Sequence, residues 1–156
     1  MVVTSAHLTL RVGEESYAVP AAIVRELVVL QPMTRVPTMP PCVRGLMNLR
    51  GTVLPVVDLA RQLGLGETAI TGQTCMMVVD IDASDGARSA IGVIADEMLD
   101  VVVLDDGNVE AAPAFGSRVN PRYLSGITRL DGRYAFVLDL TCILSPEEIF
   151  ALGEGA

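Results

Sequence analysis

The sequence predicts an all-β fold, mainly β with a few short helices. The first reason is that its apolar runs are short and are ended by Gly, Pro or Asp, which is typical of strands in barrels and sandwiches. The second is that a stretch at 45–59, two apolar runs around a Gly-closed turn, returns without a gap at 126–140. Such paired runs indicate β-hairpins, so we expect strands to dominate.

Ten segments have the length and composition of strands. They are 8–12, 17–19, 27–30, 45–49, 53–57, 75–81, 90–94, 101–104, 126–130 and 134–138. The turns that join 45–49 to 53–57 and 126–130 to 134–138 end in Gly51 and Gly132, which tolerate the positive φ that closes a tight hairpin. Arg50 would therefore project from the tip of the first hairpin.

The expected helices are short. We predict them at 21–25, 58–63, 96–99 and 121–123. Asp58 and Asp139 each end a strand and precede a turn, so we expect their side chains to cap the turns that follow. A C-terminal helix should begin at Ser145, with Pro146 in its first turn, so that 145–156 would be this helix and a frayed tail.

An internal repeat indicates two related halves. The two hairpins are displaced by 81 residues, whereas Val19 aligned with Val93 matches 26–30 to 100–104 with an offset of 74. We predict one domain over 4–150 with two β subdomains at about 8–68 and 73–144, a layout that allows strands to be exchanged between them. Each half would be only marginally stable alone, so the halves should pack on a shared apolar seam.

Composition and charge exclude several classes of function. The net charge is −8 and all eleven basic residues are Arg, scattered singly, which argues against nucleic-acid binding and excludes chemistry that needs a Lys amine. No apolar run approaches the roughly 18 residues that cross a bilayer. The N-terminus lacks the pattern of a secretory signal, so we expect a cytoplasmic protein that is not inserted in a membrane.

The residues offer little for catalysis. His7 is the only histidine, and the three widely spaced cysteines, Cys42, Cys75 and Cys142, form no metal-ligand motif. We therefore expect no catalytic residue, metal site or cofactor. A small β-barrel enzyme or ligand-binding protein is the remote alternative. Arg50 is different, because a long cation beside apolar residues at a hairpin tip suits contact with a partner protein.

The motif around Arg50 resembles the CheW-like family, the coupling proteins of bacterial chemosensory arrays. The similarity rests on Asn48-Leu49-Arg50-Gly51 followed by Pro55-Val56-Val57-Asp58-Leu59. Softer matches occur in the same order at 17–20, 24–27, 34–37, 91–96 and 138–140, so that the likeness covers about residues 8 to 145.

The resemblance implies a fold and an adaptor function. The fold would be two SH3-like five-stranded β-barrel subdomains packed together. The function would be a non-catalytic adaptor between the cytoplasmic tip of a methyl-accepting chemoreceptor and the regulatory domain of a CheA-type histidine kinase, beside membrane receptor arrays. An alternative within the family is an adaptor of a non-flagellar pathway, such as pili motility, development or second-messenger control.

The resemblance also implies partner-binding positions. These are Val24, Glu26, Arg50, Gly51, Met98 and Val101. Ala60 stands where the family often has Arg, with Arg61 following, and Ala95 and Met98 replace more usual valines. We expect these departures to affect the choice of partner and not the fold.

Overall fold

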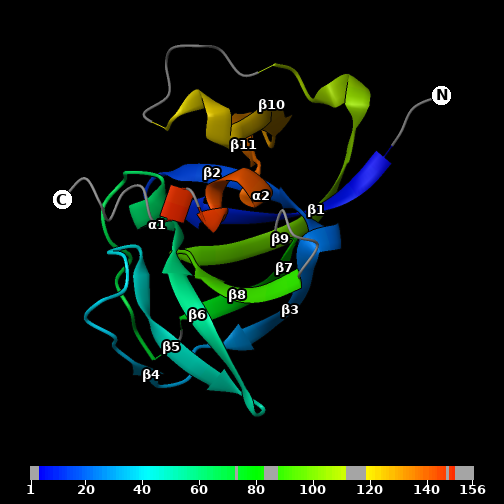
Figure 1. Ribbon diagram of the computed structural model, residues 1–156. Coiled ribbons are helices and arrows are strands. Elements are labelled where there is room, and N and C mark those ends of the chain that lie inside the picture. The colour runs from blue at the N-terminus through cyan, green and yellow to red at the C-terminus, as the bar shows by residue number, and fades with distance from the viewer. Residues whose placement is uncertain (1–3, 73, 83–87, 112–118, 147, 150–156) are drawn as a thin grey trace.

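Eleven strands form two sheets in the part of the chain that the computed structural model describes, which is every residue except 1–3, 73, 83–87, 112–118, 147 and 150–156 (Figure 1). The five-stranded sheet has the order β10-β11-β2-β1-β9. Its strands are β1 (Thr4–Val12), β2 (Glu15–Pro20), β9 (Glu97–Asp105), β10 (Leu124–Leu130) and β11 (Arg133–Leu138). All neighbours are antiparallel except β11 and β2, which are parallel.

The six-stranded sheet has the order β3-β7-β8-β6-β5-β4. Its strands are β3 (Val24–Val29), β4 (Met33–Thr34), β5 (Val43–Leu49), β6 (Thr52–Asp58), β7 (Cys75–Asp82) and β8 (Arg88–Ile94). Again one neighbouring pair, β6 with β8, is parallel and the others are antiparallel. The predicted all-β class is confirmed.

The two sheets correspond strand for strand. Replacing β10, β11, β2, β1 and β9 by β5, β6, β8, β7 and β3 turns the first order into the second, leaving only the short β4 over. The two parallel pairs also agree in register. Val137 lies beside Ala18, and Val56 lies beside Gly92. Val56 and Val137 are 81 residues apart in the sequence, and Ala18 and Gly92 are 74 apart, which are the two offsets of the repeat. Each sheet takes strands from both 8–68 and 73–144. The assignment of these two ranges as subdomains stays a prediction.

The repeated glycines have a steric reason. Gly45 and Gly126 sit at matching irregularities in β5 and β10, where another segment pairs antiparallel with the hairpin. A Cβ on Gly45 would lie 2.9 Å from the carbonyl oxygen of Thr34, and one on Gly126 would lie 2.7 Å from that of Glu110. Any larger residue would push the backbone of the paired segment away, which explains why the two positions coincide in the repeat.

The helical elements whose bounds are fully described are single turns. They are the 3-10 turns η1 (Ala21–Ile23), η2 (Asp106–Asn108) and η3 (Pro121–Tyr123) and the α-helical turns α1 (Leu59–Gln62) and α2 (Leu140–Ile143). Both predicted caps are confirmed, since the carboxylate of Asp58 accepts a hydrogen bond from the Ala60 amide and that of Asp139 from the Cys142 amide.

Some predicted elements were wrong in type or extent. The segment 96–99 is not a helix, because Glu97 and Met98 pair with β1 at the start of β9 and the sheet overrides their helix propensity. The helix predicted at 21–25 is only the turn η1, and Val24 already begins β3. The two-residue strand β4 was not predicted.

The predicted C-terminal helix lies partly outside the described residues. In the described part, Ser145 Oγ accepts from the Glu148 amide at 3.3 Å, and the Ile149 amide donates to the Ser145 carbonyl at 3.0 Å. The last few residues, which were predicted to fray, lie outside the described residues, which end at Ile149.

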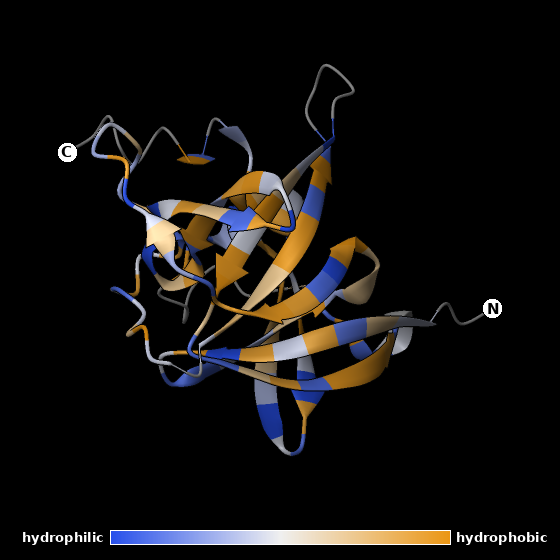
Figure 2. Ribbon diagram, turned by 90° about the horizontal axis from the view of Figure 1, so that it is seen from below, coloured by the Kyte–Doolittle hydropathy of each residue, from blue (hydrophilic) through white to orange (hydrophobic). Residues whose placement is uncertain are grey.

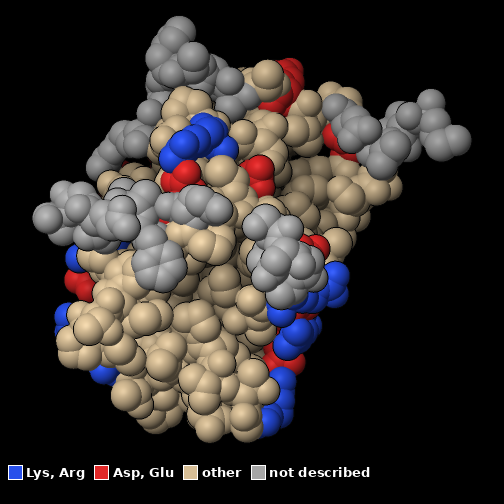
Figure 3. All heavy atoms as spheres, in the orientation of Figure 1, with Lys and Arg blue, Asp and Glu red and all other residues tan. Residues whose placement is uncertain are grey.

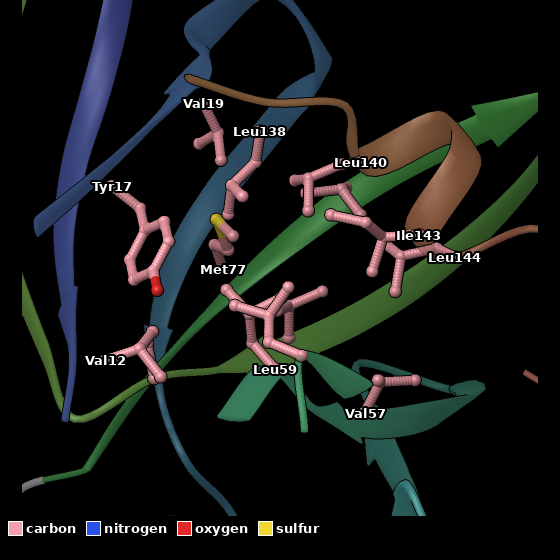
Figure 4. Packing of buried hydrophobic residues seen from close by; sticks show 14 of the residues in the cluster. Val12, Tyr17, Val19, Val57, Leu59, Met77, Leu138, Leu140, Ile143 and Leu144 are labelled. Carbon is pink, nitrogen blue, oxygen red and sulfur yellow. The ribbon is translucent and has the colours of Figure 1, made fainter. Parts of the chain in front are cut away.

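The main apolar core lies where the two sheets and the helical turns meet. Figure 4 shows Val12 and Tyr17 of the first two strands, Met77 of β7, and Leu140 and Ile143 of α2 turned toward a common centre. Two smaller cores are each built from the strands of one sheet, one from the six-stranded sheet and one from the five-stranded sheet. Figure 2 shows the matching pattern, with hydrophobic stretches in the middle of the molecule and hydrophilic ones at the hairpin ends.

One fully buried charge anchors the six-stranded sheet to α1. Asp58 has no exposed surface and accepts hydrogen bonds from the guanidinium of Arg44 at 2.8 Å and from the Thr68 amide at 2.9 Å, besides the Ala60 amide. A buried carboxylate is tolerated only when it is paired and hydrogen-bonded in this way.

We predict that Asp58→Ala is much more destabilising than Asp139→Ala. Removing Asp58 breaks a buried ion pair and a cap together and should lower the free energy of unfolding by about 3 kcal/mol or more. Asp139 is only a cap, half-buried and without an ion pair, so its loss should cost about 1 kcal/mol. Urea denaturation of both variants measures the difference, and equal losses would contradict the role given to the Arg44 pair.

A second prediction concerns Tyr123, whose hydroxyl donates to Glu148 at 2.7 Å. Burial, helped by this bond, raises the pKa of Tyr123 to about 12, above the value of about 10 in the unfolded chain. Because the neutral phenol is favoured in the folded state, its contribution to stability is complete below pH 10 and is lost between pH 10 and 12. Denaturation of the wild type and of Tyr123→Phe across this range should show the steeper decline in the wild type.

Candidate functional site

The tip of the β5–β6 hairpin is a two-residue turn with Arg50 at its apex. Arg50 has φ 51° and Gly51 has φ 90°, the left-handed pair that a type I′ turn requires. Asn48 Oδ1 accepts a hydrogen bond from the Gly51 amide at 2.9 Å, which fixes the turn. Figure 1 shows the hairpin reaching beyond the rest of its sheet at the bottom of the view. Arg50 therefore stands at the tip, as predicted.

Arg50 forms an ion pair with Glu26 of β3. The guanidinium donates to Glu26 Oε1, and the side chains are 66% and 28% exposed. The pair connects the hairpin tip to the strand at the far end of the same sheet. Three of the predicted partner-binding residues, Glu26, Arg50 and Gly51, are thus brought together.

Of the other three predicted residues, Val24 lies on the same strand as Glu26, whereas Met98 and Val101 lie on β9. Val24 precedes Glu26 by two positions and packs against the main core, as does Met98 at the start of β9. Val101 is exposed on β9 in the other sheet. Within the described residues, Met98 and Val101 have no hydrogen bond or ion pair to Glu26 or Arg50. The six positions therefore form two groups, one on β3 with the hairpin tip and one on β9.

Both groups lie on strands that carry exposed apolar side chains. Leu27 and Val29 of β3 are 50% and 55% exposed, and Val101 and Val103 of β9 are 66% and 69% exposed. The pairs are equivalent in the repeat, with an offset of 74, and β3 and β9 each end their sheet. Leu27, Val29 and Val103 were not predicted as site residues, because a fully apolar run does not reveal which of its faces meets solvent.

The end of the molecule at the β10–β11 hairpin differs in charge from the end at the β5–β6 hairpin. Asp131, with φ 50°, occupies in β10–β11 the position that Arg50 has in β5–β6, and Asp100 occupies that of Glu26. In the described part of the chain this end has no corresponding ion pair but a hollow of about 260 Å³, whose charged lining residues are Asp100, Asp131 and Arg133. Figure 3 shows that the face over β5 and β6 carries no charged side chain across its middle and that charges lie at its margins.

The described residues show no other concentration of reactive groups. His7 is nearly buried in β1, with Nδ1 3.2 Å from the carbonyl oxygen of Ser5. Burial raises the pKa of the Cys42 and Cys142 thiols, which disfavours the reactive thiolates. No three His, Cys, Asp or Glu side chains in the described ranges could hold a metal ion. No described helix combines the length and apolar character needed to span a membrane.

Comparison with known proteins places these features in a family. The model of the CheW-like domain matches residues 6–148. The chain is 28% identical over 141 residues to the probable chemotaxis protein CheW of Rhizobium etli, covering 90% of this chain and 88% of that protein. It is 30% identical over 139 residues to the chemotaxis protein CheW of Bacillus subtilis, covering 87% and 84%.

A solved structure has the same fold. The crystal structure of the scaffolding protein TtCheW from Thermoanaerobacter tengcongensis matches with a TM-score of 0.79 over 94% of this chain and 91% of that one. At 23% sequence identity, this similarity concerns the fold alone. It confirms the CheW-like arrangement of two β barrels that the motifs around Arg50 predicted.

We predict that Arg50→Asn leaves the protein folded. The ion pair with Glu26 is exposed, so its loss should change the free energy of unfolding by less than about 1 kcal/mol. Asn tolerates the left-handed backbone of position 50, whereas a β-branched residue such as Val would be strained there. Urea denaturation of Arg50→Asn and Arg50→Val tests both points. A large loss for Arg50→Asn would make the ion pair a structural requirement.

Proposed function

The chain belongs to the CheW-like domain family, and on that premise we propose that it is a non-catalytic adaptor of bacterial chemotaxis. It would link the cytoplasmic tip of a methyl-accepting chemoreceptor to the regulatory domain of a CheA-type histidine kinase, and would work in the cytoplasm beside membrane receptor arrays. Several relatives are named chemotaxis proteins, which favours a role in chemotaxis over a role in a non-flagellar pathway.

The observation that supports an adaptor best is the pair of equivalent edge strands. β3 and β9 end different sheets, and each carries two exposed apolar side chains at matching positions. An unpaired strand edge and an exposed apolar patch are both liabilities on an isolated protein, and both are typical of protein interfaces. Two such surfaces on one rigid scaffold suit a protein that holds two partners at a fixed separation.

The hairpin tip would add specificity to the β3 surface. Arg50 is largely exposed although it is paired, and a guanidinium has more donors than Glu26 uses. It can therefore bind an acceptor of a partner while Leu27 and Val29 supply apolar contact area. We propose Val24, Glu26, Arg50 and Gly51 as one contact region and Met98 and Val101 as the other.

We predict that substitutions on the two edge strands have separate effects. Leu27→Asp and Val101→Asp both place a charge on an exposed position, so neither should unfold the protein. In pull-downs with a receptor cytoplasmic fragment and with the kinase regulatory domain, each variant should lose one partner by about tenfold or more and keep the other. Loss of the same partner by both variants, or of neither, would contradict two separate docking strands.

A further prediction concerns charge at the hairpin tip. Arg50→Glu should weaken the binding of a partner by about tenfold while circular dichroism shows an unchanged fold, because the reversed charge repels an acceptor that Arg50 would bind. The matched control is Arg88→Glu, an exposed arginine paired with Asp82 near another hairpin end. If both reversals weaken binding equally, the effect is one of net charge, and Arg50 has no specific role.

A further inference from the structure

A second surface, separate from the two edge strands, has the charge of an anion-binding site. It is a hollow of about 530 Å³ between the loop that contains β4, the start of β5, α1 and the loop after α1. Its charged lining residues are Arg35, Arg44, Arg61 and Glu67. Its volume is within the range of about 300–1,000 Å³ that ligand pockets occupy. An excess of arginine in one hollow is unexpected in a chain with a net charge of −8.

Two of these arginines have no side-chain partner among the residues that the structure describes. Six of the described arginines form ion pairs with carboxylates, and Arg129 lies over the ring of Tyr134. The side chains of Arg35 and Arg61 form no ion pair or hydrogen bond within the described ranges, and both residues line the hollow. The guanidinium of Arg44 already forms an ion pair with Asp58, with 2.8 Å between Nη1 and Oδ2, and its Nε lies 3.5 Å from Glu67 Oε1. The free positive charge of the hollow is therefore that of Arg35 and Arg61.

The repeat indicates that the fold does not require Arg61. α1 and α2 are equivalent turns, each capped by an aspartate, and Cys142 of α2 occupies the position that Arg61 has in α1. The same turn packs against the core with a thiol at this position and with no cation. Folding therefore does not explain the long exposed cation at position 61, whereas contact with a ligand or partner would.

We propose that this hollow binds an acidic segment of a partner protein that carries an apolar side chain next to a carboxylate. The carboxylate would lie between Arg35 and Arg61, whose forked donors match its geometry. The apolar side chain would contact Met33, Met39 and Ile70 in the lining, and methionines adapt readily to the shape of a bound group.

Other anionic surfaces fit the hollow less well. An anionic membrane attracts clusters of four to eight basic residues, whereas two free arginines in a hollow of an acidic protein would be outweighed by its net charge of −8. Nucleic acid needs a series of basic contacts along its backbone for the same reason. A short peptide offers one or two carboxylates and an apolar group within the space available.

The test is a titration of the full chain, labelled with 15N, with the peptides acetyl-Glu-Leu-Glu-Leu-amide and acetyl-Gln-Leu-Gln-Leu-amide. The acidic peptide should shift amide resonances of the lining residues in a saturable way and bind at least about fivefold more tightly than the neutral one. Arg61→Ser and Arg35→Ser should each weaken its binding by about fivefold. Arg133→Ser is the matched control, since Arg133 is also exposed and its side chain has no ion pair or hydrogen bond among the described residues, but it does not line this hollow.

Four results would overturn the proposal. The first is no saturable shift at millimolar peptide, and the second is equal binding of the two peptides or equal loss in Arg133→Ser. The third is inorganic phosphate binding at the same residues as tightly as the acidic peptide, which would make the hollow a site for small anions. The fourth is cosedimentation of the wild type, but not Arg61→Ser, with phosphatidylserine vesicles, which would assign it to a membrane. None of these results affects the adaptor proposal, because the hollow shares no residue with β3 or β9.

Discussion

The apolar core between the two sheets is the constraint on which the rest of the structure depends. It is built from both halves of the repeat, with Val12 and Val19 from β1 and β2 packed near Leu138 and Ile143 from the end of the chain. Because the first two strands of each half pair in the sheet completed by the other half, neither half can bury its apolar faces alone. This interlocking fixes the relative position of β3 and β9, which a rigid two-partner scaffold needs.

The repeat separates residues that serve the fold from residues that do not. Positions that the backbone needs are the same in both halves: the glycines beside a closely paired segment, the glycines of the hairpin turns and the capping aspartates. Positions that face solvent have diverged in charge. The pairs that differ in charge are Arg50 with Asp131 and Arg61 with Cys142, whereas Glu26 and Asp100 are both acidic. A duplicated scaffold has thus acquired two chemically different ends, as expected if each end meets a different partner.

Much of the fold could be predicted from the sequence, because strands, hairpin turns and caps are set by neighbours in the chain. The Asn48–Gly51 turn, the Asp58 cap and the offsets of 81 and 74 needed no tertiary information. The errors lie where sheet pairing decides the outcome, as at 96–99, which Arg11 and Leu10 of β1 hold as a strand. The exposure of Leu27 and Val103 could not be predicted, because it depends on which strands end each sheet.

The ion pair of Arg50 within the fold is compatible with the binding role proposed for the same side chain. Its sequence position alone suggested a free cation for a partner, whereas the structure pairs it with Glu26. An exposed pair of this kind contributes only about 0.2–1 kcal/mol, so exchanging or sharing it costs little. The pair also keeps the long side chain ordered before binding, which reduces the conformational entropy lost when a partner docks. Glu26 is then best understood as the residue that holds Arg50 in place at the tip, and a partner that contacts one of them necessarily acts on both.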